Sequence, residues 1–219
     1  MPQLNKISLS DQVYQILRKR IITAAVPMGG SLNISELKSE FGTSSTPIRE
    51  ALNRLQGEGL VVYSNNVGAK VIRLDRQDIH NIHDVTMVLH SAAIRFAMER
   101  GDHQAIADDI QRHISSYREA SSIDDLIESV HGLINVFYDH CGNPKLKETM
   151  RVVEGPQLMI RYLFHQYMGA DYSNVKEHQE VYEAVLAGDT ERIVANYIHN
   201  IQRADEIICG LLESSIQLS

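Results

Sequence analysis

The chain has 219 residues, 43% of them hydrophobic and 22% charged, a composition that excludes a disordered polypeptide. No apolar run approaches the roughly 20 residues that span a bilayer, and charges among the first twenty positions argue against a signal peptide. The two cysteines, Cys141 and Cys209, have no metal-binding or redox spacing. The sequence therefore predicts a reduced, cytoplasmic protein without a membrane partner.

Charge divides the chain into two parts. The net charge is −7 overall, but residues 1–75 carry nine Lys and Arg against six Asp and Glu, a net charge of +3. The remaining residues carry −10, and all ten histidines lie at or after His80. We therefore expect two domains, residues 1–75 and 76–219, of which the basic first domain contacts phosphate.

Three short helices are predicted in the first domain. Ser10 can cap a helix whose apolar face holds Val13, Ile16, Leu17 and Ile21. Residues 33–36 (NISE) form a capping box for a helix that ends at Gly42. Residues 43–46 offer hydroxyl caps and Pro47 suits a first turn, so a third helix begins there and ends near Gly57 or Gly59.

A β-hairpin follows the third helix. Residues 60–63 and 69–73 are apolar or β-branched runs, separated by a turn at Asn65 and Asn66. Helix, helix, tight turn, helix and hairpin, in that order, are the plan of a winged helix-turn-helix, whose third helix reads the major groove. The sequence thus predicts binding to double-stranded operator DNA.

Beyond Asp75 the apolar residues recur at helical spacing only. Six helical segments are expected, with glycine, serine or proline between them: residues 78–100, 102–121, 123–141, 144–167, 174–187 and 189–213. Such a series forms an all-α antiparallel bundle, and bundles hold ligands between facing helices. The predicted fold class is therefore mainly α.

Several motifs resemble known families. SEL (35–37), FGTS (41–44), TPIREALNRL (46–55) and EGLV (58–61) resemble the DNA-binding domain of GntR regulators. GNPKL (142–146), EHQ (177–179), AVLAGD (184–189) and His199 resemble the FCD sensor of the FadR-like branch. The resemblance implies a homodimeric bacterial transcription regulator, a repressor or an activator. A small effector, usually a carboxylic acid, controls such proteins, often with a divalent metal in the sensor.

The chain departs from the family at two places. Ser45 stands where the family usually has an arginine that contacts DNA, so operator preference is expected to differ. On the first sensor helix, Thr86, Leu89 and His90 stand where the family often has an Arg followed by Leu-Glu. A carboxylate-binding arginine is therefore missing from that helix.

Candidate DNA contacts cluster around the third helix and the hairpin. Arg49 lies one turn past Thr46 and suits a groove contact, while hydroxyls at the helix start and Lys38 suit phosphates. The hairpin tip suits the minor groove. The alternatives are plain caps, solvated cations and an ordinary turn. The predicted set is Lys38, Ser44, Ser45, Thr46, Arg49, Asn65, Asn66 and Lys70.

A sensor metal, zinc or nickel, is expected from the resemblance. It implies His178 and His199 as ligands, on consecutive helices. The family's other two ligand positions fall on Val130 and Ile134 in ungapped alignment, so we predict His131 as third ligand, with Asn135 or Glu128 as fourth. The alternative is an organic-ligand site without metal.

Arg161 and Arg95 are candidate partners for an effector carboxylate, each with a surface arginine as the alternative. We predict a ligand-responsive transcription regulator, a repressor controlled by a carboxylic-acid-like metabolite. It is expected to act as a homodimer, because operator affinity generally comes from two half-sites. A metal-dependent enzyme is disfavoured, since the sequence has no catalytic metal or nucleophile motif. An adaptor that lost DNA binding with the change at Ser45 is the other alternative.

Overall fold

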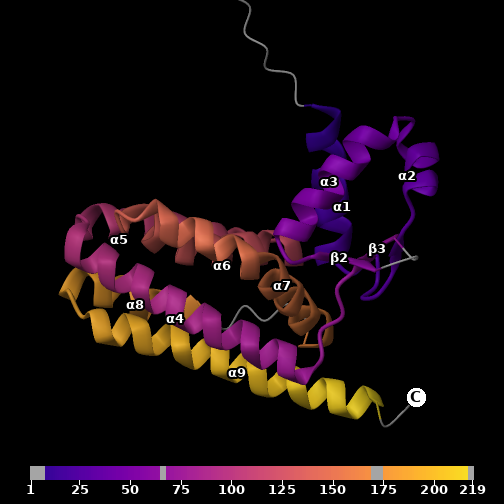
Figure 1. Cartoon of the computed structure of the whole chain (residues 1–219). Coiled ribbons are helices and arrows are strands. Elements are labelled where there is room, and N and C mark those ends of the chain that lie inside the picture. Colours follow the sequence, from indigo (N-terminus) through magenta and orange to yellow (C-terminus); the bar gives the residue numbers. More distant parts are fainter. Residues whose placement is uncertain (1–7, 65–67, 169–174, 217–219) are drawn as a thin grey trace, which may run out of the picture. The chain divides into compact units, whose positions relative to one another are not determined.

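Figure 1 shows the computed structural model, which describes residues 8–64, 68–168 and 175–216. The chain separates into two compact units. The first contains the residues up to Asp75 together with Val152–Met159, and the second contains Arg76–Arg151 and the residues from Ile160 onward. Residues 152–159 lie in the middle of a long helix. The sequence analysis placed them in the second domain, whereas in the structure they belong to the first unit.

The first unit is a three-helix domain with a small sheet. The sheet has the strand order β1-β3-β2, with antiparallel pairs that set Ser31 opposite Lys70 and Val61 opposite Val71. Strand β1 has only two residues, too few to show a pattern in the sequence. The elements are α1 (Leu9–Ile22), β1 (Ser31–Leu32), α2 (Ile34–Phe41), α3 (Ser45–Gly57), β2 (Val61–Ser64) and β3 (Gly68–Val71).

Local capping explains where these helices begin and end. Helix α1 is capped by Ser8, whose hydroxyl accepts a bond from the Asp11 N–H at 3.0 Å, so the predicted cap Ser10 was wrong and lies inside the first turn. Asn33 caps α2 through the N–H groups of Ser35 and Glu36. Gly42 ends α2 in the left-handed conformation, with φ of 60°. The last two features confirm the expectation.

Helices α1 and α3 pack together through aliphatic side chains. Leu17 and Ile21 of α1 and Ile48, Leu52 and Leu55 of α3 have no exposed surface. Burial of each contributes about 1.5–3 kcal/mol. The packing fixes the rotation of α3 about its axis and therefore decides which side chains it presents outward.

The second unit is entirely helical among the residues that the structure describes. Figure 1 shows α4 and α9 running beside each other, and α4 also packs on α6, while α5 packs on α6 and α8. None of the helices in the described ranges is long and apolar enough to cross a membrane. The helices are α4 (Arg76–Arg100), α5 (His103–Glu119), α6 (Ile123–His140), α7 (Pro144–Met168), α8 (Val175–Ala187) and α9 (Thr190–Ile216), with the middle of α7, Val152–Met159, belonging to the first unit.

Helix α4 carries a buried stripe of mixed chemistry. Its buried positions recur every three or four residues, which is the period of one helix face. Three of the buried side chains are polar, namely His83, Thr86 and His90, each no more than 5% exposed. The stripe comprises Ile79, His83, Thr86, His90, Ala93, Ile94, Ala97 and Met98.

Two glycines give opposite expectations for stability. An added methyl group would meet no atom within 4 Å at Gly42 or at Gly57, so only backbone conformation distinguishes them. Gly42→Ala should lower the free energy of unfolding by about 1–2 kcal/mol, because a side chain disfavours positive φ. Gly57→Ala, in the last position of α3, should raise it by about 0.4–1 kcal/mol. Urea unfolding followed by circular dichroism measures both changes. Equal destabilisation by the two substitutions would contradict the assignment of the left-handed conformation to Gly42 and of helical conformation to Gly57.

Candidate DNA-binding face and sensor site

Helix α3 has one buried and one exposed face. Ile48, Ala51 and Leu52 point into the first unit, whereas Thr46 and Arg49 are exposed. Arg49 makes no hydrogen bond or ion pair with any residue in the described ranges. Its guanidinium is therefore available to an external partner.

The start of α3 has unused polar groups. Ser44 occupies the N-cap position with extended backbone, but its hydroxyl makes no capping bond. The first N–H groups of a helix have no partner within the helix and carry partial positive charge. The Ser44 hydroxyl and this helix end together offer donors to a phosphate, with Ser45 half-buried in the first turn and Thr46 exposed.

The remaining predicted DNA contacts are spread over the first unit. Lys38 is exposed on α2, and Lys70 is half-buried on β3. Neither forms an ion pair with a residue that the structure describes. Asn65 and Asn66 lie outside the described residues.

A polar network that the sequence did not predict holds α3 to α1. Tyr14 donates its hydroxyl hydrogen to Glu58, the residue after α3, and the Arg18 Nε donates to the other carboxylate oxygen at 2.9 Å. The Arg54 guanidinium lies 3.8 Å from the centre of the Tyr14 ring. Burial and the bond to Glu58 raise the pKa of Tyr14 to about 12, so the phenol remains a donor at neutral pH. The expected core residue Ile16 is instead 42% exposed, and Tyr14 is buried.

Arg161 on α7 is the unusual group of the second unit. Its Nη1 is buried and has no hydrogen-bond partner among the described residues. Its charge acts on His90 of α4 and His178 of α8, and it also interacts with Tyr197 of α9. We call these four residues the Arg161 cluster. Burial lowers the pKa of Arg161 to about 10, which leaves the guanidinium charged at pH 7.

The two histidines of the cluster are neutral at pH 7. Burial, with the charges of Arg161 and His131, lowers the pKa of His90 to about 3. Burial and Arg161 lower the pKa of His178 to about 4. The Nδ1 of His90 lies 3.0 Å from the Tyr138 hydroxyl oxygen. The Nδ1 of His178 is buried without a hydrogen-bond partner among the described residues.

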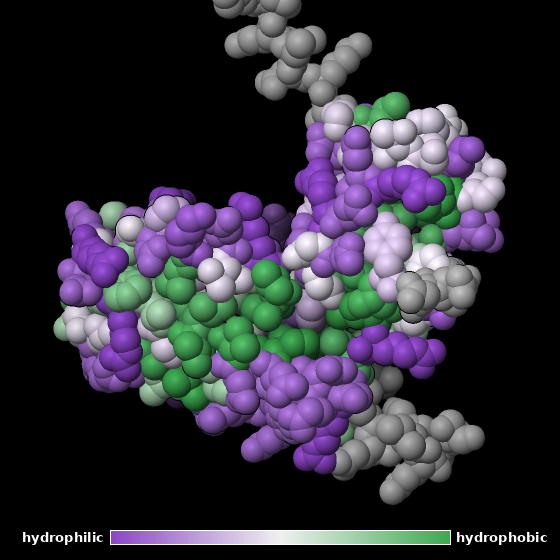
Figure 2. Space-filling model, in the orientation of Figure 1, coloured by the Kyte–Doolittle hydropathy of each residue, from purple (hydrophilic) through white to green (hydrophobic). Residues whose placement is uncertain are grey.

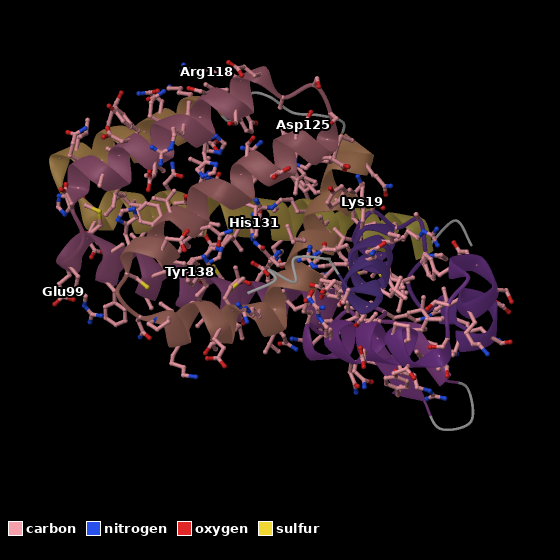
Figure 3. All side chains as sticks on the ribbon, turned by 90° about the horizontal axis from the view of Figure 1, so that it is seen from above. Lys19, Glu99, Arg118, Asp125, His131 and Tyr138 are labelled. Atoms are coloured by element: carbon pink, nitrogen blue, oxygen red, sulfur yellow. The ribbon has the colours of Figure 1, made fainter. Side chains whose placement is uncertain are left out.

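The four predicted metal ligands are not gathered into one centre. His131 and Asn135 share a face of α6, with the Asn135 amide nitrogen 3.3 Å from the His131 ring nitrogens, and Figure 3 shows His131 among the helices. His178 belongs to the Arg161 cluster, while His199 is exposed on α9. Because Tyr197 and Ile201 of α9 pack inward, His199 between them turns outward. Glu128, the alternative fourth ligand, is also exposed.

A metal cation does not fit among the residues of the Arg161 cluster. The cluster already contains a buried, unpaired guanidinium, which repels a second positive charge at short range. Within the described ranges, the three His, Cys, Asp or Glu side chains that come close enough to share a metal are His80, Asp205 and Cys209. These were not predicted from the sequence.

Arg95 lies on the exposed face of α4. It is exposed and forms a bidentate ion pair with Glu191 of α9, with each of its two terminal nitrogens bonded to one carboxylate oxygen. Since α4 buries Ala93, Ile94 and Ala97, position 95 points outward. Effector binding by Arg95 stays a prediction, and its exposed pair with Glu191 does not support it. The sequence analysis did not name His90 or Tyr197 as candidate effector residues, although both interact with Arg161 in the structure. The available signal for His90 was its place among apolar residues at helical spacing.

Comparison with known families gives matches to both units. Residues 9–71 match the family described as "Bacterial regulatory proteins, gntR family", and residues 81–202 match the "FCD domain" family. The chain belongs to the FCD-containing GntR family. This confirms the resemblance inferred from the motifs.

Curated relatives of this GntR-family chain are regulators. It is 23% identical over 207 residues to the uncharacterized HTH-type transcriptional regulator YdhC of Bacillus subtilis, covering 90% of this chain and 91% of that one. It is 20% identical to the HTH-type transcriptional repressor RspR of Escherichia coli, covering 94% and 92%. Over 97 residues it is 36% identical to the gluconate operon transcriptional repressor of Bacillus licheniformis, covering 44% and 38%.

Solved structures share the fold. Escherichia coli McbR/YncC superposes with a TM-score of 0.77 at 19% identity, covering 94% of this chain and all of that one. A GntR regulator from Rhodococcus sp. RHA1 superposes with a TM-score of 0.73 at 20% identity, covering 92% and 97%. The fold class, a winged helix-turn-helix followed by a helical domain, is confirmed.

This GntR-family chain is a DNA-binding transcription regulator with an FCD domain. The matched families and the relatives named above are regulators, so the enzyme alternative has no support.

The buried histidines predict how stability depends on pH. His90 has a folded-state pKa far below the unfolded value of about 6.5, so the unfolded chain binds more protons between pH 6 and 4 and stability falls as the pH falls. His90→Gln should reduce this slope by up to one proton, about 1.4 kcal/mol per pH unit. Denaturant unfolding between pH 7 and 5 measures it. His199→Asn changes an exposed histidine and is the control, which should keep the wild-type pH dependence of the free energy of unfolding. If His90→Gln also kept that pH dependence, the burial of His90 would be contradicted.

Proposed function

We propose that this regulator is a homodimeric repressor that binds operator DNA through its first unit. Its release from DNA is controlled by a small carboxylate that pairs with Arg161. The observation that carries the proposal is the buried Nη1 of Arg161, which has no hydrogen-bond partner among the described residues. The proposal places DNA recognition and effector recognition on different units.

The energetics favour an anion at Arg161. An unpaired charge removed from water costs several kcal/mol, and a carboxylate can return much of this through two parallel N–H···O bonds. The neighbouring His90 and His178 are neutral at pH 7, so they supply polar contacts without competing for the anion as cations. Tyr197 keeps its proton because burial raises its pKa, and it can act as a further donor. The chemistry of the cluster therefore suits a small carboxylic acid.

DNA recognition is assigned to α3 and its surroundings. Arg49 is the side chain that we assign to a base edge, while the Ser44 hydroxyl and the N–H groups at the start of α3 bind phosphate. Thr46, Lys38 and Lys70 add phosphate contacts around this face, and the net charge of +3 over residues 1–75 supports it.

Dimerisation through the helical unit is supported by apolar surface. Figure 2 shows hydrophobic side chains gathered on the face of that unit turned to the viewer. On α4, Val85 and Val88 are 45% and 69% exposed. Contiguous apolar surface of this kind marks protein contacts, and two copies would supply the two reading helices that a pair of half-sites requires.

Arg49→Ala should weaken operator binding without unfolding the chain. Loss of a direct base contact is expected to cost about 1–3 kcal/mol, or roughly 5-fold to 150-fold in affinity. Gel shift on the DNA that flanks the gene, at matched salt, measures the change, and light scattering of the complex should give two chains per operator.

Arg118→Ala is the matched control, since it removes one exposed arginine from the other unit. Ser45→Arg should raise the affinity and steepen its salt dependence, because one more cation would displace counterions. Equal affinities of Arg49→Ala and wild type would remove Arg49 from the interface. Absence of any DNA binding by wild type would favour the adaptor alternative.

Arg161→Gln should abolish the response to carboxylates. We expect at least one acid from a panel of acetate, lactate, succinate, gluconate and citrate to raise the melting temperature of wild type by binding the folded state. The same acid should leave Arg161→Gln unmoved. Arg95→Gln, which loses the exposed pair with Glu191, should respond as wild type does. A full response in Arg161→Gln would place the effector elsewhere.

A further inference from the structure

A second polar cluster lies between α4 and α9, and the charge of Arg161 also acts on one of its members, His83. Two histidines one turn apart on α4, His80 and His83, face Asp205 of α9. One turn further along α9 is Cys209, a buried cysteine that is not in a disulfide. These four residues, here called the His80 cluster, join positions more than 120 residues apart in the chain.

The geometry brings three ligand types to one point. The His80 Nδ1 lies 2.6 Å from Asp205 Oδ2, and the His83 Nδ1 lies 2.7 Å from Asp205 Oδ1. The ligand atoms of His80, Asp205 and Cys209 all lie within 4.8 Å of one another. Zinc bound at about 2.0–2.3 Å to such atoms in a tetrahedron separates them by roughly 3.3–3.8 Å. Small side-chain rotations would therefore make the site.

The cluster also opens onto space. A cleft of about 350 Å³ is lined by His80, His83 and Asp205 together with Asp84, Ile201 and Glu206. Two of the three proposed ligands, His80 and Asp205, line the cleft, and three protein ligands leave one coordination position for water or a small molecule. The acidic side chains around the cleft add negative charge, which favours a cation.

We infer that His80, Asp205 and Cys209 bind one zinc-type divalent metal ion, with His83 holding the Asp205 carboxylate in position and a fourth coordination site facing the cleft. Imidazole, carboxylate and thiolate are the ligand set that zinc takes. The bond from His83 to Asp205 fixes the carboxylate as partners outside the ligand shell commonly do. The ion would fasten the N-terminal turns of α4 to α9.

A carboxylate shared by two imidazoles is also a stable arrangement without metal. The thiol separates the two explanations, because Cys209 is not needed to satisfy either His–Asp bond. If the cluster is only an ion-pair network, replacing Cys209 will not change metal binding. If it is a metal site, the thiol must lose its proton on binding and become a ligand.

The test uses the full-length protein, stripped with chelator and reloaded with one equivalent of Zn(II) or Co(II). Wild type should retain one metal per chain after desalting, melt at a higher temperature when loaded, and show a thiolate-to-Co(II) charge-transfer band. Cys209→Ser and His80→Asn should lose the metal, the band and the thermal shift. His83→Gln should retain the band but bind about 10–100-fold more weakly.

Cys141→Ser and His178→Gln are the matched controls. Cys141 is the other buried cysteine, directly after the end of α6, and His178 belongs to the Arg161 cluster. Both variants should bind metal as wild type does. If Cys209→Ser fails to fold, His80→Asn still tests metal binding, because His80 is half-exposed and its replacement is expected to leave the fold intact. The inference is overturned if wild type binds no metal, if His80→Asn keeps it, or if His178→Gln loses it.

Discussion

Three polar side chains lie on the buried stripe of α4, where water cannot satisfy them. Thr86 donates to the carbonyl of Ile82 on its own helix at 2.7 Å. The other two reach across the unit, His83 to Asp205 on α9 and His90 to Tyr138 on α6. Because a buried polar group without a partner costs about 1–3 kcal/mol, these bonds limit how α4 can be rotated or shifted against its neighbours. Both polar clusters of the helical unit depend on that placement.

Along α4 the two clusters have opposite electrostatic character. Around His90 the charged group is the Arg161 guanidinium, whose Nη1 is buried without a hydrogen-bond partner among the described residues. Near the start of α4, His80 and His83 share the Asp205 carboxylate, with a thiol one turn away. The first environment favours an anion and the second a cation. Under the two proposals made above, the helical unit would respond to two different ligands.

The first unit achieves its exposed reading face by a different means. Aliphatic packing of α1 on α3 fixes the rotation of α3, and the contacts among Tyr14, Arg18 and Glu58 secure the end of that helix. With Ile48 and Leu52 inside, Arg49 is necessarily outside. The exposed face then depends on few side chains. Serine at position 45, in place of the family's usual arginine, therefore removes one positive charge from the face that we propose for DNA, without changing the aliphatic packing beneath it.

The sequence by itself determined the order of the elements, their approximate bounds and the family. Apolar period, the Asn33 cap and the Gly42 stop are local signals, and they act through hydrogen bonds and backbone preferences within a few residues. Only the tertiary structure decided which polar residues face inward: Arg161 and not Arg95, Tyr197 and not His199. One residue along a helix rotates a side chain by about 100°, so the inward set depends on the partner helix that each face meets. Likewise, no local spacing joins His80 to Asp205 and Cys209, because their meeting depends on how α4 packs against α9.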